Sequence, residues 1–218
     1  MKKSHRNIER MSKFQLGALD NNMLDYDFNK LKEFLNIKGR VIFDKNFRLH
    51  KEDNALLFVL CCYFIQDQNS SAIIGLDINK GLLISGPVGC GKTSLMKLMP
   101  YLASHKIKYE TIPTRNIVNN FNAAGFEVLK KYKDTKDYCF DDLGLEPTGC
   151  HNTRDCNVMG EILLSRYDLF KAKKVKTHIT TNLNTEELEA RYGSQFISRL
   201  GEMFNLVSFK DDSVDKRK

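Results

Sequence analysis

The stretch SGPVGCGKTSLMKL, residues 85–98, decides the fold of this chain. Three glycines stand within six positions, a lysine and a threonine follow directly, and the remaining residues have the composition of a helix. The apolar run Leu82 to Ser85 directly before the glycines is expected to form a short buried strand. Glycines between a strand and a helix let the backbone turn successive N–H groups toward an anion at the helix start. The sequence therefore predicts a phosphate-binding loop at the end of a buried strand.

The loop fits the pattern G-x-x-x-x-G-K-[ST] through Gly86, Gly91, Lys92 and Thr93. Lys92 is expected to reach the β- and γ-phosphates of ATP, and the Thr93 hydroxyl is expected to bind Mg²⁺. A chance match in a chain of this length is on the order of 1%, so a glycine-rich turn without a ligand is the weaker interpretation. The residues expected to hold the nucleotide are Gly86, Pro87, Val88, Gly89, Cys90, Gly91, Lys92, Thr93 and Ser94.

Length and composition favour one globular domain with a short extension. The chain has 218 residues, of which 42% are hydrophobic and 28% are charged. Its longest apolar run, Ala55 to Ile65, is too short to span a bilayer and predicts a buried helix. The basic start lacks the apolar stretch of a secretory signal, and the six cysteines form no disulfide framework, so we expect a cytoplasmic protein without a membrane anchor. Cys150, His151 and Cys156 lack a second pair at zinc-site spacing and are interpreted as loop residues.

From residue 81 onward, short apolar runs alternate with longer helical patterns, which predicts an α/β fold with a parallel sheet flanked by helices. The expected strands are Leu82–Ser85, Lys108–Ile112, Tyr138–Asp141, Lys176–Thr181 and Leu206–Phe209. The expected helices are Lys92–Ser104, Asn116–Lys131 with a break at Gly125, Asn157–Phe170, Asn184–Arg191 and Gln195–Phe204. Residues 142–155 are expected to be a polar loop. The predicted domains are a polar arm at 1–50 with a helix near Phe28–Leu35, an ATPase domain at 51–209 and a basic tail at 210–218.

Two carboxylates follow the third expected strand in the segment YCFDDLG, residues 138–144. Ligands bind at the carboxyl ends of strands in open parallel sheets. We expect Asp141 to hold Mg²⁺ through water and Asp142 to orient and deprotonate the attacking water. A pair of solvated acids in a turn is the alternative, and the phosphate-binding loop upstream makes the catalytic interpretation the stronger one.

Asn182 and two arginines complete the candidate site. The segment HITTNL, residues 178–183, ends in an amide that either contacts the water or the γ-phosphate, or caps the next helix. Arg199 and Arg191 stand in RYGSQFISRLGEMF, residues 191–204, far from the loop in sequence. An arginine that reaches the γ-phosphate of a neighbouring subunit accelerates phosphoryl transfer by roughly 10³ to 10⁵, although most surface arginines have no such role.

In order, GPVGCGKT, CFDDLG, TTNL and RYGSQFISRL resemble the Walker A, Walker B, sensor 1 and arginine-finger motifs of AAA+ ATPases. The resemblance is closest to the DnaC-type helicase loaders and the IstB-type transposition helpers, and it covers about residues 50–209. It implies a five-stranded sheet in the order 5-1-4-3-2, ATP between adjacent subunits, and Arg199 acting in trans, with Arg191 as the lesser candidate. Only nine residues follow Phe209, so we expect no full C-terminal lid, and Arg217 is no convincing second sensor.

The resemblance implies an ATP-hydrolysing switch in DNA replication or mobile-element mobility. Its expected partners are further copies of itself in a ring or spiral, a replicative helicase or a transposase, and single-stranded or double-stranded DNA. A net charge of +7 is compatible with such an anionic partner. Two alternatives stay open. One is a P-loop small-molecule kinase, for which the sequence offers no arginine-rich lid, and the other is a nucleotide-dependent structural partner with little turnover.

Overall fold

The structure is a computed structural model that describes residues 16–20, 23–102 and 108–217. The chain divides into two compact units, one formed by residues 1–74 with 97–108 and the other by residues 75–96 with 109–218. The glycine-rich loop belongs to the second unit. None of the helices in the described ranges is both long enough and apolar enough to cross a membrane. The domain limits at residues 50 and 209 stay predictions.

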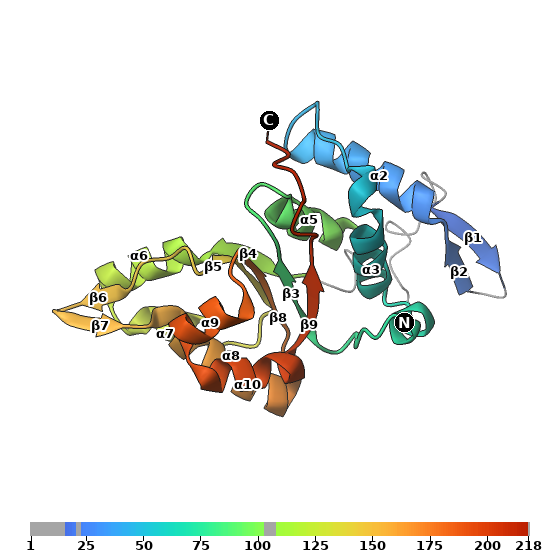
Figure 1. Cartoon of the computed structure of the whole chain (residues 1–218). Coiled ribbons are helices and arrows are strands. Elements are labelled where there is room, and N and C mark those ends of the chain that lie inside the picture. Colours follow the sequence, from blue (N-terminus) through green and yellow to red (C-terminus); the bar gives the residue numbers. More distant parts are fainter. Residues whose placement is uncertain (1–15, 21–22, 103–107, 218) are drawn as a thin grey trace. The chain divides into compact units, whose positions relative to one another are not determined.

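In the described part of the first unit, an antiparallel pair of strands precedes the helices (Figure 1). Helix α2 begins after Asp27, whose carboxylate accepts hydrogen bonds from the N–H groups of Asn29 and Lys30. The helix expected near residues 28–35 is confirmed and is longer than expected. The buried helix expected at 55–65 is also confirmed. The two strands were not predicted. The elements are β1 (Gly17–Asp20), β2 (Met23–Tyr26), α2 (Phe28–Ile42), η1 (Lys51–Asp53), α3 (Asn54–Ile65), α4 (Gln68–Ile73) and η2 (Met99–Tyr101).

The second unit is built on a five-stranded sheet in which every neighbouring pair is parallel. Its strands are β3 (Gly81–Ser85), β4 (Glu110–Pro113), β5 (Tyr138–Leu143), β8 (Thr177–Thr181) and β9 (Phe204–Ser208). The spatial order is β4-β5-β8-β3-β9. Counted along the chain within this sheet and read from β9, the order is 5-1-4-3-2, so the expected topology and the α/β fold class are confirmed.

Helices connect the strands, and those from residue 114 onward bury apolar side chains in one cluster with the sheet. The cluster is centred on large side chains that are fully buried, among them Phe121, Phe140, Ile162, Ile179 and Phe196. The helices are α5 (Lys92–Leu98), α6 (Thr114–Ala124), α7 (Glu127–Lys131), α8 (Val158–Lys173), α9 (Thr185–Tyr192) and α10 (Ser194–Met203). The expected break at Gly125 is confirmed, because this glycine has φ +70° and ends α6.

Helix α5 is shorter than expected. It ends at Leu98 and is followed by the 3₁₀ turn η2, which contains Pro100. Proline has no N–H to donate and its ring obstructs the preceding turn, so an α-helix does not continue through it. The expected helix ran to residue 104, and its last two positions lie outside the described residues.

The segment expected to be a polar loop contains a β-hairpin, which corrects that prediction. Strands β6 (Gly149–His151) and β7 (Arg154–Cys156) pair antiparallel, and Figure 1 shows them at one end of the second unit. The two turn residues, Asn152 and Thr153, have φ of 50° and 64°. Two consecutive left-handed residues make the turn type that matches the twist of a tight hairpin. Asn-Thr is a weak signal for this turn, since threonine is branched at Cβ.

The start of β5 and β8 is held by a buried arginine. Arg166 of α8 is fully buried, and its guanidinium donates to the Thr177 hydroxyl and to the carbonyl oxygens of Tyr132, Asp134, Lys136 and Lys176. Burial lowers the pKa of Arg166, and the negative charge of Asp137 opposes that shift. A buried guanidinium is tolerated only when its N–H groups are satisfied. Arg166 therefore ties the segment 132–136 to the start of β8, at the end of the sheet opposite the glycine-rich loop.

A buried histidine makes the stability of the second unit depend on pH. His178 on β8 is fully buried, its Nδ1 accepts the Leu82 N–H at 3.2 Å, and burial lowers its pKa from 6.5 to about 3. Between these two pH values the unfolded chain binds more protons than the folded chain, so stability decreases as the pH falls below about 6.5. We expect His178→Gln to reduce the loss of urea resistance between pH 7 and pH 5. His151→Gln, at the half-buried last residue of β6, is the control, and an unchanged pH slope in His178→Gln would contradict the assignment.

Candidate functional site

The glycine-rich loop has the backbone that its sequence predicts. Gly86, Gly89 and Gly91 have φ of 150°, 82° and 105°, which favour glycine over residues with a side chain. A Cβ atom on Gly86 would lie 2.7 Å from the Cβ of Phe209, so space as well as backbone angle requires glycine there. The loop joins the end of β3 to the start of α5 (Figure 1). The predicted strand, loop and helix are all present, which is the context that this motif needs.

Lys92 lies in the loop rather than in solvent. Its ammonium group donates to the carbonyl oxygens of Gly86 at 2.7 Å and Pro87 at 2.9 Å, and to the amide oxygen of Asn182. The side chain is buried, and burial lowers its pKa, while the nearby Cys90, Asp142 and Asp141 oppose that shift. A buried cation held by carbonyl and amide dipoles in a phosphate-binding loop is placed to exchange those partners for phosphate oxygens.

Asp141 connects the loop with two strands of the sheet. Its Oδ1 accepts one hydrogen bond from the Thr93 hydroxyl at 2.8 Å and a second from the Thr180 hydroxyl at 2.6 Å. Thr93 follows Lys92 in α5, Asp141 is on β5 and Thr180 is on β8. The structure therefore brings together Thr93 and Asp141, the pair expected to bind Mg²⁺. Thr180 was not predicted, although its place two residues before Asn182 on an expected strand was visible in the sequence.

Asp142 is set apart from Asp141 by an irregularity in β5. The pairing of β5 with β8 shifts between Phe140 and Leu143, and Asp142 has φ of 57°. Its N–H donates to the Thr180 hydroxyl at 2.9 Å, and its carbonyl oxygen accepts from the Thr114 hydroxyl at 2.9 Å. A non-glycine residue in the left-handed region is a strained conformation that aspartate and asparagine adopt more readily than other residues. The bulge therefore directs the Asp142 carboxylate differently from a side chain in a regular strand.

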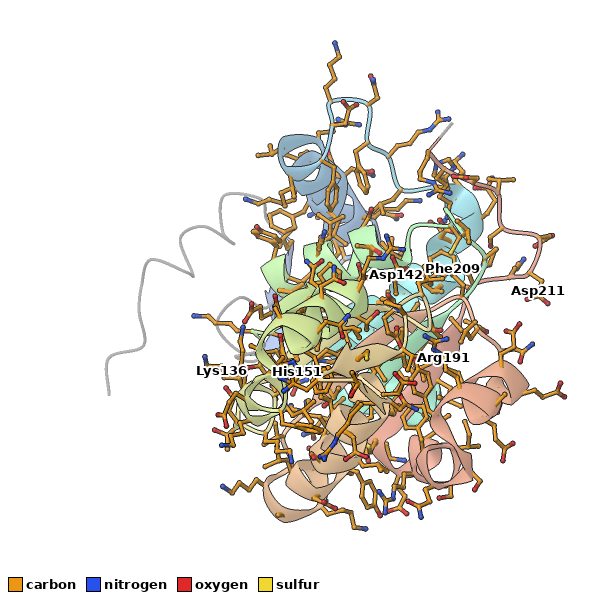
Figure 2. All side chains as sticks on the ribbon, turned by 90° about the vertical axis from the view of Figure 1, so that its left-hand side faces the viewer. Lys136, Asp142, His151, Arg191, Phe209 and Asp211 are labelled. Atoms are coloured by element: carbon orange, nitrogen blue, oxygen red, sulfur yellow. The ribbon has the colours of Figure 1, made fainter. Side chains whose placement is uncertain are left out.

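The pKa of Asp142 is raised, first by burial and then by the negative charge of Asp141. The cations Lys92, Arg115 and Arg217 oppose that shift. A carboxylate whose pKa is raised toward neutrality is a better proton acceptor while it stays ionised at neutral pH. Figure 2 shows Asp142 among the side chains of the second unit. No sequence pattern indicated that Arg115 and Arg217 would lower the pKa of Asp142.

Asn182 does not cap the following helix. The cap of α9 is Asn184, whose side chain accepts the Glu187 N–H, while the Glu187 carboxylate accepts the N–H of Asn184. Asn182 instead accepts a hydrogen bond from the Lys92 ammonium. The structure thus brings the amide to the phosphate-binding loop, and a sensor role remains a proposal.

The two candidate arginines lie elsewhere. Arg191 donates to the carboxylate and carbonyl of Glu146, whose side chain is almost completely buried and also accepts from Gly144 and Tyr192. It therefore anchors the segment that follows Asp142. Arg199 places its guanidinium over the Tyr167 ring, 4.5 Å from the ring centre. Among the described residues, no hydrogen bond or ring contact links Arg199 to Lys92, Thr93 or the carboxylates.

The side chains present fit a magnesium nucleotide. The left-handed glycines leave the loop without side chains where phosphates would approach, and a buried cation stands at its base. Thr93 and Asp141 offer a hydroxyl and a carboxylate, the oxygen ligands that Mg²⁺ prefers when it also takes water and phosphate oxygens. No group of three or more histidine, cysteine, aspartate or glutamate side chains that could hold a metal by itself occurs among the described residues, those of the β6–β7 hairpin included.

The parallel sheet and the sequence of strand, glycine-rich loop and helix together have the arrangement of a P-loop fold. No protein-family profile and no curated protein sequence matches the chain. The crystal structure of the DnaC helicase loader matches with a TM-score of 0.55 and 21% identity, covering 77% of this chain and 95% of that one. The crystal structure of DnaI matches with a TM-score of 0.53 and 18% identity, covering 76% and 89%. The predicted resemblance to DnaC-type AAA+ proteins is confirmed at the level of the fold.

Proposed function

We propose that this chain binds and hydrolyses ATP as a switch in DNA replication or mobile-element mobility, in the manner of a helicase loader or a transposition helper. The observation that carries the proposal is the double hydrogen bond on Asp141. The Thr93 hydroxyl of the phosphate-binding loop and the Thr180 hydroxyl of β8 donate to the same carboxylate oxygen. A loop threonine and a strand aspartate in contact form the magnesium end of a nucleotide site. The fold shared with the DnaC helicase loader supports this reading.

The side chains have separate roles in the proposed reaction. Lys92 would bind the β- and γ-phosphates after leaving the carbonyl oxygens of Gly86 and Pro87. Thr93 and Asp141 would hold Mg²⁺, which neutralises charge on the phosphates when it is bound. Asp142 would orient the attacking water and take its proton, and its raised pKa suits that task. Asn182 would hydrogen-bond the water or the γ-phosphate.

The proposed site is completed by a second copy of the chain. Arg199 is on α10 and contacts Tyr167 of α8 instead of the phosphate-binding loop. A guanidinium that lies away from its own site and is partly exposed is available to a neighbouring copy. We therefore propose that Arg199 acts in trans in a ring or spiral, that the assembly forms on single-stranded or double-stranded DNA, and that a replicative helicase or a transposase is the partner.

Single-turnover hydrolysis of ATP, with and without single-stranded DNA, tests the proposed function. Conversion of ATP to ADP and phosphate that depends on magnesium and is altered by DNA is the expected result. Tight ATP binding without measurable turnover under both conditions would instead identify a nucleotide-dependent structural partner. Absence of ATP binding would reject the proposal.

Arg199→Ala is expected to lower kcat for ATP hydrolysis by about 10³-fold, with ATP affinity in dilute protein unchanged. The reason is that the guanidinium stabilises charge that develops on the transferred phosphate only when two copies meet. Steady-state kinetics over a range of protein concentrations measures the effect. Arg154→Ala, on the exposed strand β7, is the matched control.

Mixing Arg199→Ala with Lys92→Ala tests whether the site is shared. The Lys92 variant supplies an intact Arg199, and the Arg199 variant supplies an intact phosphate-binding loop. Hydrolysis that appears only in the mixture supports an arginine acting in trans. A mixture no more active than its components contradicts it.

A further inference from the structure

The segment that follows β9 returns to the phosphate-binding loop. The Phe209 N–H donates to the Ser85 carbonyl at 2.9 Å, which extends the pairing of β9 with β3 up to the start of the loop. The Ser213 N–H then donates to the Lys210 carbonyl at 3.0 Å, which turns the chain back. Figure 2 shows Phe209 inside the unit and Asp211 on the outer side of this turn. The turn brings residues 215–217 against the loop.

Lys216 makes two hydrogen bonds to the loop with different parts of the residue. Its backbone N–H donates to the Gly89 carbonyl at 3.1 Å, and its ammonium group donates to the Cys90 carbonyl at 2.6 Å. The ammonium also lies 4.8 Å from the centre of the Phe209 ring, so the side chain is held from a second side. The loop therefore has an external support from a residue 126 positions away in the sequence.

The two carbonyl groups belong to the peptide planes that carry the N–H groups of Cys90 and Gly91. In a trans peptide the C=O and N–H groups point in opposite directions. Holding the Gly89 carbonyl therefore fixes the N–H of Cys90, which donates to the Pro87 carbonyl at 3.5 Å and closes the turn of the loop. Holding the Cys90 carbonyl fixes the N–H of Gly91 in the same way. A cation on a carbonyl also polarises the amide and strengthens the N–H as a donor.

Neighbouring residues adjust the charge and the space at this contact. The Arg217 guanidinium binds the Asp215 carboxylate with distances of 3.0 and 2.8 Å. This pair offsets the negative charge of Asp215 where it lies against Gly89, since a Cβ atom on Gly89 would be 2.1 Å from its Oδ1. The segment 215–217 then carries a net charge of about +1 beside the site. Such a charge suits a loop that receives phosphates.

We propose that Lys216 is a positioning residue of the nucleotide site, which holds the turn at Gly89 and Cys90 in place and with it the orientation in which the Gly91 N–H meets a diphosphate. Preorganised donors raise affinity because less ordering remains to be done on binding. The inference rests on the proposed nucleotide-binding function and goes beyond it, since Lys216 lies outside the loop motif. It concerns binding of the diphosphate and leaves the chemistry of hydrolysis to other residues.

The test compares ADP binding by the wild-type chain, Lys216→Met and Lys216→Arg, using isothermal titration calorimetry. Lys216→Met keeps the length of the side chain and removes its charge, and we expect it to weaken ADP binding about tenfold. Lys216→Arg keeps a cation and is expected to restore most of the affinity. Lys210→Met, an exposed lysine of the same segment, is the matched control and is expected to bind ADP like the wild type.

A second measurement separates positioning from general stabilisation. The thermal midpoint of ligand-free Lys216→Met is expected to fall only slightly, because the backbone hydrogen bond to Gly89 remains. Its affinity for AMP, which lacks the β-phosphate, is expected to change much less than that for ADP. Unchanged ADP binding in Lys216→Met would overturn the inference, and tighter binding would also overturn it, because the segment would then compete with the nucleotide. Failure of the wild type itself to bind ADP or ATP would reject the proposed function instead.

Discussion

Lys92→Ala is expected to abolish ATP hydrolysis and to lower ATP affinity by about 100-fold. The Lys92 ammonium is the buried cation at the base of the phosphate-binding loop, and it is held there by the carbonyl groups of Gly86 and Pro87 and by Asn182. Its removal leaves a phosphate group in the loop without a positive partner. Titration with a fluorescent ATP analogue measures the affinity, and phosphate release measures the hydrolysis.

Lys97→Ala provides the control for this variant. Lys97 is on the same helix, five residues further along, and is exposed. Its replacement is expected to leave nucleotide binding unchanged. Wild-type affinity in Lys92→Ala would mean that phosphates do not enter the glycine-rich loop, and the assignment of the site would fail with it.

Asp142→Asn is expected to keep ATP affinity and to lower kcat by about 10⁴-fold. Asparagine has nearly the same shape as aspartate and tolerates the left-handed backbone at φ 57°, so the bulge in β5 is expected to persist. What the variant loses is the carboxylate that takes a proton from water. Single-turnover kinetics at saturating ATP measures the chemical step without a contribution from binding.

The pH profile gives Asp142 a second readout. Burial and Asp141 raise the pKa of Asp142, so wild-type hydrolysis is expected to decline on acidification at a higher pH than an ordinary aspartate would cause. The residual rate of Asp142→Asn is expected to lack that decline. Asp155→Asn, on the exposed strand β7, is the control. Normal turnover in Asp142→Asn would show that another group accepts the proton.

The sheet and the conformation of the glycine-rich loop were predictable because each depends on local sequence. The three glycines, Lys92 and Thr93 stand at fixed spacing, and apolar runs of strand length recur between helical patterns. The position of Asp141 beside Thr93 followed from the topology, since the loop that follows β3 and the end of β5 lie at the same edge of one parallel sheet. The strand order itself came from the resemblance to AAA+ proteins and was then confirmed by the pairing of β9 with β3.

Other features depend on contacts between distant segments and left no local signal. The bulge at Asp142 follows from how β5 pairs with β8 beyond Phe140. The β6–β7 hairpin lacks an Asn-Gly turn, so its sequence resembles a loop. Arg191 binds Glu146, a buried residue 45 positions earlier in the chain, and no local sequence pattern indicates that contact. The contact of Lys216 with the phosphate-binding loop spans more than half of the chain.

The shared oxygen of Asp141 has a mechanical consequence. Thr93 and Thr180 both donate to the same acceptor, so any ligand that draws the Thr93 hydroxyl away changes the environment of the hydrogen bond that tethers β8. Thr180 stands five positions before the start of α9, which is followed at once by α10 and Arg199. A ligand in the loop would thus alter the stiffness of β8. That change would reach α10, the helix proposed to meet a neighbouring copy, without any movement of the sheet as a whole.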